Sequence, residues 1–344
     1  MKVIQLLNWK LESIEKELDT IKKQGFDAIQ INPMQPFKKQ EVFKWWLSYQ
    51  PLGFRVGNVF GTKEDLKRLC QKAKEKDIKI IVDVVLNHTA NKSNNEPCIP
   101  HETVDPILRN NKEFWKEPCL VQNYSNRKDA VTHCIGLPGL NLNNIELQKI
   151  IFNYLDELVD CGVSGFRFDA AKHIGFPNDG VSFFEYVRIY LELYGLYGYG
   201  EILGGTKEWN DEMSKYIHVH MPAGNQITYA NLAVVFGESH DTYLNDKNNT
   251  RNLDNNLLIC TYNFLRLYYQ NTLVYVRPLD ANGPYCKNID NLTFDEVLKL
   301  KEKDYFTDLY FSNDNIRKIN NNILTINDML NLRNIENKVK IKKK

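Results

Sequence analysis

The sequence has no apolar run long enough to cross a lipid bilayer and no excess of charge of either sign. A membrane-spanning helix needs about 20 predominantly apolar residues, so no transmembrane segment is predicted. Lysine and arginine total 44 against 43 aspartate and glutamate residues, which leaves a net charge of +1. This balance gives no global attraction to nucleic acid or to an anionic membrane. We therefore expect neither as a partner, and we expect a monomer.

Cysteine is also scarce: there are seven, an odd number with no paired spacing. Such a pattern is typical of scattered buried or free thiols in a reducing compartment. Residues 1–9 form an apolar run that Gln5 and Asn8 interrupt, too short for a signal peptide. We expect a first buried strand there. For the chain as given we predict the cytoplasm, and a secreted protein if an export signal was removed.

What the sequence does contain is an alternation of strand and helix patterns, which predicts a parallel sheet covered by helices. With 344 residues, 43% of them hydrophobic, the chain can form two domains or one large α/β barrel. The expected strands are residues 3–7, 28–31, 78–85, 165–169, 199–202, 217–220, 232–236 and 272–276. The expected helices are residues 13–25 with Ser13 as N-cap, 62–73 with a capping box at Thr62, 147–158, 183–193, 207–216, 257–269 and one near 313–319. Repeated units of this number favour a (β/α)8 barrel over an open sheet.

Two stretches break the alternation. Residues 89–143 are polar, rich in Asn, Pro and Cys, and too long for an ordinary loop, so we expect an inserted subdomain. Beyond Pro284 the chain is rich in Asn and Lys and ends in a basic, solvated tail. The predicted fold is a TIM barrel formed by residues 1–88 and 144–320, with residues 89–143 inserted after the third strand and a tail at residues 321–344.

Polar residues mark four strand ends, where the chemistry of such barrels is located. They lie in residues 83–88, 165–173, 199–203 and 236–242. Arg167 and Asp169 are two residues apart on a strand and therefore point to the same side, where the cation keeps the carboxylate ionised as a nucleophile requires. Glu201 has apolar and aromatic neighbours that would raise its pKa for proton donation. Asp241, next to His240, adds a third carboxylate.

Any one of these carboxylates could instead be a salt-bridged core residue, and a lone His88 is more often structural than catalytic. Four such clusters at successive strand ends are much harder to explain by structure alone. Two carboxyl groups in unlike environments on either side of one bond are what glycoside cleavage requires.

These four regions resemble the signature regions of the α-amylase family of retaining glycoside hydrolases, glycoside hydrolase family 13. The first runs from Asp83 to His88 and the second covers residues 165–173. Gly200 and Glu201 match the third region, and residues 238–241 match the fourth. The strings at residues 166–173, 199–203 and 238–243 look most like bacterial α-amylases of the Bacillus subtilis kind. The resemblance spans residues 3–320.

The resemblance implies roles for individual residues in cleaving α-1,4-glucosidic bonds of starch, glycogen or maltooligosaccharides by double displacement. Asp169 corresponds to the nucleophile, Glu201 to the general acid/base and Asp241 to the carboxylate that stabilises the transition state. The residues that correspond to substrate contacts are Tyr49, Gln50, His88, Arg167, Lys172, His173 and His240. Tyr49 is the expected aromatic platform for the sugar, whereas Trp45 and Trp46 are expected in the core.

The insertion matches the family's domain B, which usually shares a calcium ion with the barrel. The resemblance places Asn87 by its side chain and His173 by its main-chain carbonyl at that ion, with Asp129 as a plausible acid from the insertion. Oxygen ligands of this sort suit Ca²⁺. Asp129 could equally be a solvated loop residue.

The sequence also departs from the family. Residues 222–229 are too few for a covering helix, so the sixth strand–helix unit is expected to be abbreviated or missing, with exposed apolar surface and an unpaired strand edge. The family's C-terminal β-domain is expected to be missing, and Gly139 stands where the family commonly has an acid. Two alternatives stay open: a glucanotransferase with the same site, and a truncated glucan-binding homologue without catalysis.

Overall fold

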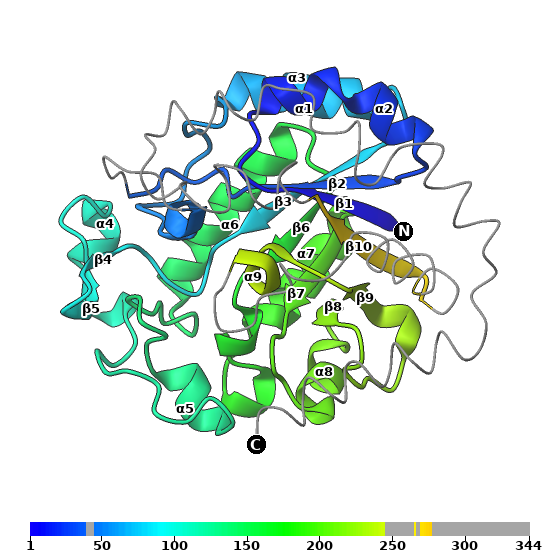
Figure 1. Ribbon diagram of the computed structural model, residues 1–344. Helices are drawn as coiled ribbons and strands as arrows, with labels where there is room; N and C mark the ends of the chain where they lie inside the picture. Colours follow the sequence, from blue (N-terminus) through cyan, green and yellow to red (C-terminus); the bar gives the residue numbers. More distant parts are fainter. Residues whose placement is uncertain (39–44, 245–264, 266–268, 277–344) are drawn as a thin grey trace.

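The computed structural model describes residues 1–38, 45–244, 265 and 269–276, and within them eight parallel strands close into a barrel (Figure 1). The order around the barrel is β1-β10-β9-β8-β7-β6-β3-β2. The strands are β1 (Lys2–Leu6), β2 (Ala28–Ile31), β3 (Lys79–Val84), β6 (Gly165–Phe168), β7 (Tyr197–Glu201), β8 (His218–Pro222), β9 (Ala233–Phe236) and β10 (Asn271–Tyr275). The predicted (β/α)8 TIM barrel is confirmed.

The helices outside the barrel bury their apolar stripes against the strands. They are α1 (Leu11–Lys16), α2 (Leu18–Lys23), α3 (Lys63–Lys74), α6 (Ile145–Asp160), α7 (Phe183–Tyr194) and α8 (Lys207–Met213). The short helix α9 (His240–Leu244) follows β9 and lies in front of the strands in Figure 1. The capping box of α3 is confirmed, since the Thr62 hydroxyl accepts from the Asp65 N–H at 3.1 Å and Asp65 accepts from the Thr62 N–H at 2.9 Å. Ser13 as an N-cap was wrong. The first helix begins at Leu11, which is buried and whose N–H donates to the Phe60 carbonyl at 2.8 Å, so packing sets the helix start.

The sixth unit keeps its strand and lacks its helix. Between β8 and β9, residues 223–232 contain only a 3-10 turn (Ala230–Leu232), which confirms the abbreviation. The expected unpaired edge was wrong, because β8 pairs with β7 on one side and with β9 on the other. The expected exposed apolar surface was also wrong at this strand: Val219 and Met221 are 0% and 1% exposed.

The insertion after β3 lies to one side of the barrel (Figure 1, left). It contains a two-stranded antiparallel sheet of β4 (Asn91–Ser93) and β5 (Glu96–Pro100), and the short helices α4 (Pro106–Arg109) and α5 (Arg127–Thr132). The limits expected for the insertion, residues 89–143, stay a prediction. Five cysteines lie in the described part of the chain, and all five are free thiols.

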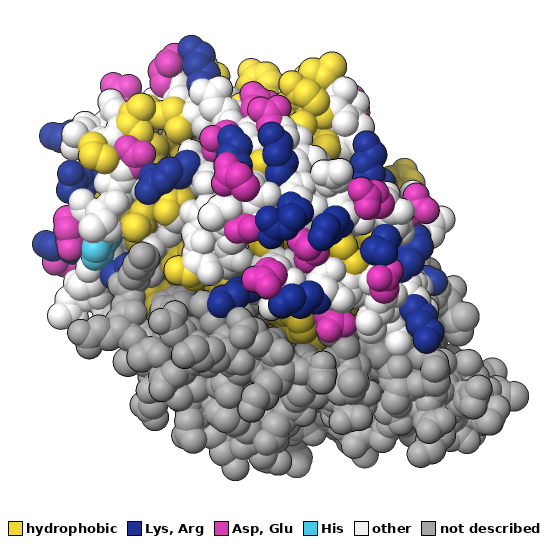
Figure 2. Space-filling model, turned by 90° about the horizontal axis from the view of Figure 1, so that it is seen from above, with side chains coloured by type: hydrophobic (Ala, Val, Ile, Leu, Met, Phe, Trp, Pro, Cys, Tyr) yellow, Lys and Arg dark blue, Asp and Glu magenta, His cyan; other side chains and the backbone are white. Residues whose placement is uncertain are grey.

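Charges of both signs alternate over the face above α1, α2 and α3 (Figure 2). Glu15 on α1 pairs with Arg68 and Lys72 on α3. This intermixing matches the balanced composition. None of the helices described here is long and apolar enough to span a bilayer. The expected helix near 313–319, most of the expected helix 257–269, and the tail at 321–344 lie outside the described residues.

Candidate active site

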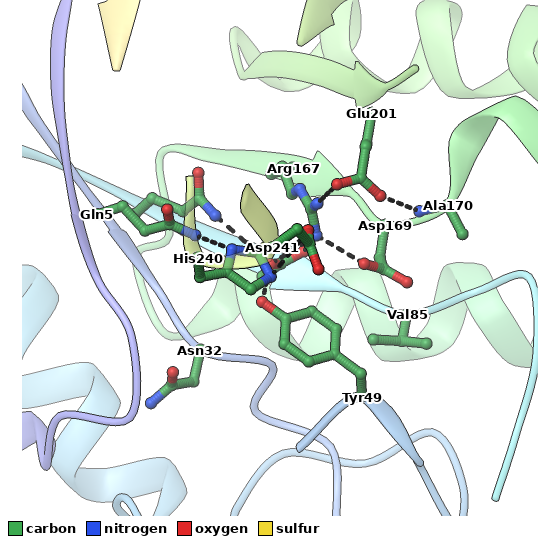
Figure 3. A network of polar contacts seen from close by, with 12 residues as sticks. Gln5, Asn32, Tyr49, Val85, Arg167, Asp169, Ala170, Glu201, His240 and Asp241 are labelled. Atoms are coloured by element: carbon green, nitrogen blue, oxygen red, sulfur yellow. Dashed lines mark hydrogen bonds and ion pairs between the residues drawn. The ribbon is translucent and has the colours of Figure 1, made fainter. Parts of the chain in front are cut away.

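Three strand ends meet on the guanidinium of Arg167, a β6 residue with no exposed surface. Its Nη1 donates to both carboxylate oxygens of Asp83 at 2.8 Å and to Oδ1 of Asp169 at 2.7 Å. Its Nη2 contacts Oε1 of Glu201 at the end of β7. In Figure 3 the carboxyl groups of Glu201 and Asp169 both lie to the right of this guanidinium, with Glu201 above Asp169. The expectation that Arg167 and Asp169 share the inner face is confirmed.

Asp83, on β3, was not among the predicted site residues. The available signal was an acid in the middle of an apolar, β-branched strand, where an unpaired charge would be costly. Asp83 also accepts a hydrogen bond from the Tyr49 hydroxyl at 2.9 Å. It therefore connects the cation to the predicted aromatic platform.

One buried cation serves several carboxylates, so they cannot all be ionised at neutral pH. Burial raises the pKa of Glu201 to about 8, with Asp241 and Asp169 adding to the effect and Arg167 opposing it. Burial likewise raises the pKa of Asp83 to about 7 and that of Asp241 to about 6. Burial alone would lower the pKa of Arg167, but the surrounding carboxylates raise it well above its usual value. The cluster therefore combines a permanent cation with a stored proton, which resides most readily on Glu201.

The loop after β6 also contacts Glu201. The backbone N–H of Ala170 donates to Oε2 of Glu201 at 3.1 Å. Ala170 has φ 48°, a left-handed conformation that is uncommon for a residue with a side chain. Such backbone strain is found disproportionately at functional sites, where the surrounding structure holds it in place. Here it orients an N–H toward the carboxyl group with the raised pKa.

His240 connects the far side of the site to β1. Burial lowers the pKa of His240 to about 3, so its ring is neutral. Its Nδ1 lies 2.8 Å from the amide nitrogen of Gln5, which can only donate, and the ring proton is therefore on Nε2. Nε2 lies 3.2 Å from Oδ2 of Asp241 and donates to it. Tyr49 stacks on His240 with ring centroids 5.1 Å apart, and Figure 3 shows this arrangement.

A pocket opens over these groups at the carboxyl ends of the strands. It brings together most of the residues predicted from the sequence: Tyr49, His88, Asp169, Lys172, His173, Glu201, His240 and Asp241. Arg167 lies beneath it. Gln50 is 8% exposed and does not line the pocket; its side-chain oxygen has no hydrogen-bond partner among the described residues. Trp45 and Trp46 are half-buried and line the pocket, so the expectation of a core position was wrong for Trp45. Trp46 also packs against the core cluster of Phe37, Leu47 and Phe60.

Comparisons with known proteins identify the family. The sequence profile of the alpha-amylase catalytic domain matches residues 9–317. The chain belongs to the alpha-amylase family.

Relatives in the alpha-amylase family match at moderate identity. An alpha-amylase of Clostridium acetobutylicum is 37% identical over 175 residues, which are 50% of this chain and 23% of that protein. An alpha-amylase of Butyrivibrio fibrisolvens is 23% identical over 87% of this chain and 37% of its own length. The chain thus spans well under half the length of these relatives.

Solved alpha-amylase structures share the fold. That of Malbranchea cinnamomea has a TM-score of 0.68 at 17% identity, over 93% of this chain and 76% of that one. That of Geobacillus thermoleovorans, complexed with acarbose, has a TM-score of 0.64 at 18% identity, over 88% and 77% of the two chains. At these identities the likeness supports the barrel architecture alone.

The residues expected to bind the alpha-amylase calcium ion do not fit such an ion as they are arranged here. The amine of Lys116 lies 2.8 Å from Oδ1 of Asn87 and 2.8 Å from the carbonyl oxygen of His173. Burial lowers the pKa of Lys116 to about 7, yet an amine donates hydrogen bonds in either protonation state. Asp129 accepts from the N–H groups of Gln122 and Asn123 at 3.1 and 2.7 Å.

Asp129 is held further by His133, whose Nδ1 contacts its Oδ1. These partners all belong to the insertion, so Asp129 is engaged in shaping the turn before α5. Among the described residues no group of three or more His, Cys, Asp or Glu side chains could hold a metal ion. Lys116 was missed by sequence reasoning, because a lone lysine in a polar segment is usually solvated.

Replacing Arg167 by methionine is expected to destabilise the protein by about 3–5 kcal/mol, because it leaves buried carboxylates without their cation. Urea unfolding measures the change. The control is Arg68→Met, which removes an arginine that is 44% exposed and should cost less than about 1 kcal/mol. Equal losses in the two variants would mean that Arg167 does not organise the site.

Proposed function

We propose that this chain is a retaining α-glycoside hydrolase that cleaves α-1,4-glucosidic bonds in starch, glycogen or maltooligosaccharides. The observation that carries the proposal is the pair of carboxyl groups, Asp169 and Glu201, bound to neighbouring nitrogens of one guanidinium at the base of an open pocket. Burial raises the pKa of Glu201 to about 8, as a proton donor requires.

In the first step Asp169 attacks the anomeric carbon while Glu201 gives its proton to the departing glycosidic oxygen. The product is a covalent glycosyl-enzyme ester and a free sugar hydroxyl. In the second step Glu201 takes a proton from water, and the resulting hydroxide displaces the carboxylate of Asp169. At the end of the second step Asp169 is again a carboxylate and Glu201 is again protonated.

The shared guanidinium keeps the two carboxyl groups near each other, which supports the double displacement proposed here. Retaining enzymes place the two groups about 5–5.5 Å apart, whereas inverting enzymes leave about 6.5–9.5 Å for a water molecule. Asp169 and Glu201 contact Nη1 and Nη2 of Arg167, two nitrogens of one rigid planar group. A guanidinium shared in this way holds the carboxylates close together.

The pocket walls suit a sugar ring. Tyr49 and Trp45 offer aromatic surfaces, and an apolar sugar face can pack on an aromatic ring. His88 and His240 also line the pocket, and burial lowers the pKa of both, so their rings add no charge to its wall. Lys172 donates to the Leu203 carbonyl at 3.2 Å and closes the side of the pocket beyond Glu201.

A product analysis with maltoheptaose tests the proposal. We expect shorter oligosaccharides, glucose and maltose, and the first-formed reducing ends should be α-anomers when proton NMR follows the reaction from its start. Initial β-anomers would rule out double displacement.

The same experiment separates the two alternatives. Products longer than the substrate would indicate a glucanotransferase, in which a sugar hydroxyl replaces water in the second step. Turnover no faster than that of Asp169→Asn, with the protein folded, would indicate a glucan-binding homologue. The missing sixth helix motivates this last alternative, but the intact pairing of β8 gives no sign of a disrupted barrel.

A further inference from the structure

The amine of Lys116 joins three separate parts of the chain. Lys116 belongs to the insertion, and its Nζ donates to Oδ1 of Asn87, which follows β3, at 2.8 Å. The same Nζ donates to the main-chain carbonyl oxygen of His173, in the loop after β6, at 2.8 Å. That loop begins at Asp169. One side chain therefore attaches the insertion to the segments that follow β3 and β6, two of the three strands whose acidic residues surround Arg167.

The surroundings of Lys116 are shaped for its side chain. Its backbone N–H donates to the Gly139 carbonyl at 2.9 Å, and Gly139 in turn lies opposite His88 in an antiparallel bridge. A Cβ atom at Gly139 would lie 2.7 Å from Cδ of Lys116, closer than such atoms approach in proteins. The absence of a side chain at Gly139 thus leaves the space through which the lysine reaches Asn87.

A second basic side chain of the insertion bonds the neighbouring carbonyl groups of the same loop. Arg127 on α5 donates to the carbonyl oxygens of Lys172 at 2.7 Å and Ile174 at 2.9 Å, and its guanidinium lies 4.0 Å from the ring centre of Phe176. With Lys116 on His173, three consecutive carbonyl groups accept from basic side chains of the insertion. The contact between insertion and barrel is therefore built with nitrogen donors.

A calcium ion at this place would need more oxygen ligands than the described residues offer here. Calcium takes six to eight oxygens, typically with carboxylates among them. Within the described residues no carboxylate lies within ion-pair distance of Lys116, and Asp129 is bound inside the insertion. Two neutral carbonyl oxygens are too few for the metal but are enough for one amine.

We infer that Lys116 takes over in this chain the structural role that a bound calcium ion would have, by cross-linking Asn87, the insertion and the loop after β6 without a metal. The fold of the site is then independent of calcium. This inference concerns stability and metal binding, which are measured without substrate, so it stands or fails separately from the proposed hydrolysis.

Thermal melting and calcium binding test the inference. The melting temperature of the unaltered protein should be the same in calcium and in a chelator, and titration calorimetry should detect no calcium binding. Lys116→Met should lower the melting temperature by about 5–10 °C, because it leaves two carbonyl acceptors without their donor.

The matched control is Lys112→Met, four residues earlier in the insertion and exposed, which should melt within about 1 °C of the unaltered protein. Melting of Lys116→Met together with this control would overturn the inference. So would a rise in the melting temperature of the unaltered protein on adding calcium. If Lys116→Met does not fold, the calcium titration of the unaltered protein still decides.

Discussion

Asp169→Asn should lower kcat for maltoheptaose hydrolysis by at least about 10⁴-fold, because an amide cannot form the glycosyl ester. The fold should be retained. The amide oxygen still accepts from Nη1 of Arg167, and the side chain keeps its size, so the melting temperature should stay close to that of the unaltered protein. Reducing-sugar release and a thermal melt on the same preparation measure both quantities.

The control for this variant is Asp160→Asn, the same change on an exposed residue at the end of α6. It should leave kcat unchanged. A kcat of Asp169→Asn within tenfold of the control would show that Asp169 is not the nucleophile and would leave the proposed mechanism without its first step.

Glu201→Gln should lower kcat/KM for maltoheptaose by about 10²–10⁴-fold, the usual range for loss of a general acid. The loss should be much smaller for an aryl maltoside with an acidic phenol as leaving group, because that oxygen departs without a proton. This difference between substrates distinguishes a proton donor from a residue that only binds sugar. A reducing-sugar assay and phenol release measure the two rates.

The pH profile gives a second test of Glu201. Burial raises its pKa to about 8, and the acid must carry its proton to act. Activity of the unaltered enzyme should therefore persist through neutral pH and fall as the pH rises past about 8. Glutamine does not titrate, so the residual activity of Glu201→Gln should lack this decline. Glu208→Gln, an exposed glutamate on α8, serves as the control and should keep it.

Much of the candidate site could be predicted because each part depends on local pattern. Strand periodicity placed Arg167 and Asp169 on one face, and parallel strands in a barrel necessarily end on the same rim. The acidic residues of separate strands therefore had to converge. The resemblance to the family then named Asp169, Glu201 and Asp241 together, and the pocket contains all three.

Other features could not be read from the sequence, because they depend on contacts between distant residues. Gln5 and His240 are 235 residues apart, yet their contact fixes the ring tautomer. Trp45 and Trp46 have the composition of core residues, and only the opening of the pocket beside them leaves them half-buried. The spacing between residues 203 and 238 indicated a missing helix, but not that β8 would still pair on both sides.

The sequence by itself determined the barrel and the end of the barrel at which the acidic residues lie. Both follow from periodicities of two and 3.6 residues and from strand order. Only the tertiary structure decided which groups share Arg167 and what lies between Asn87 and His173. The departure at Gly139 was visible in the sequence, but its meaning depends on Lys116 lying beside it. The space beside a glycine can be read from the sequence, but only the fold shows which side chain occupies it.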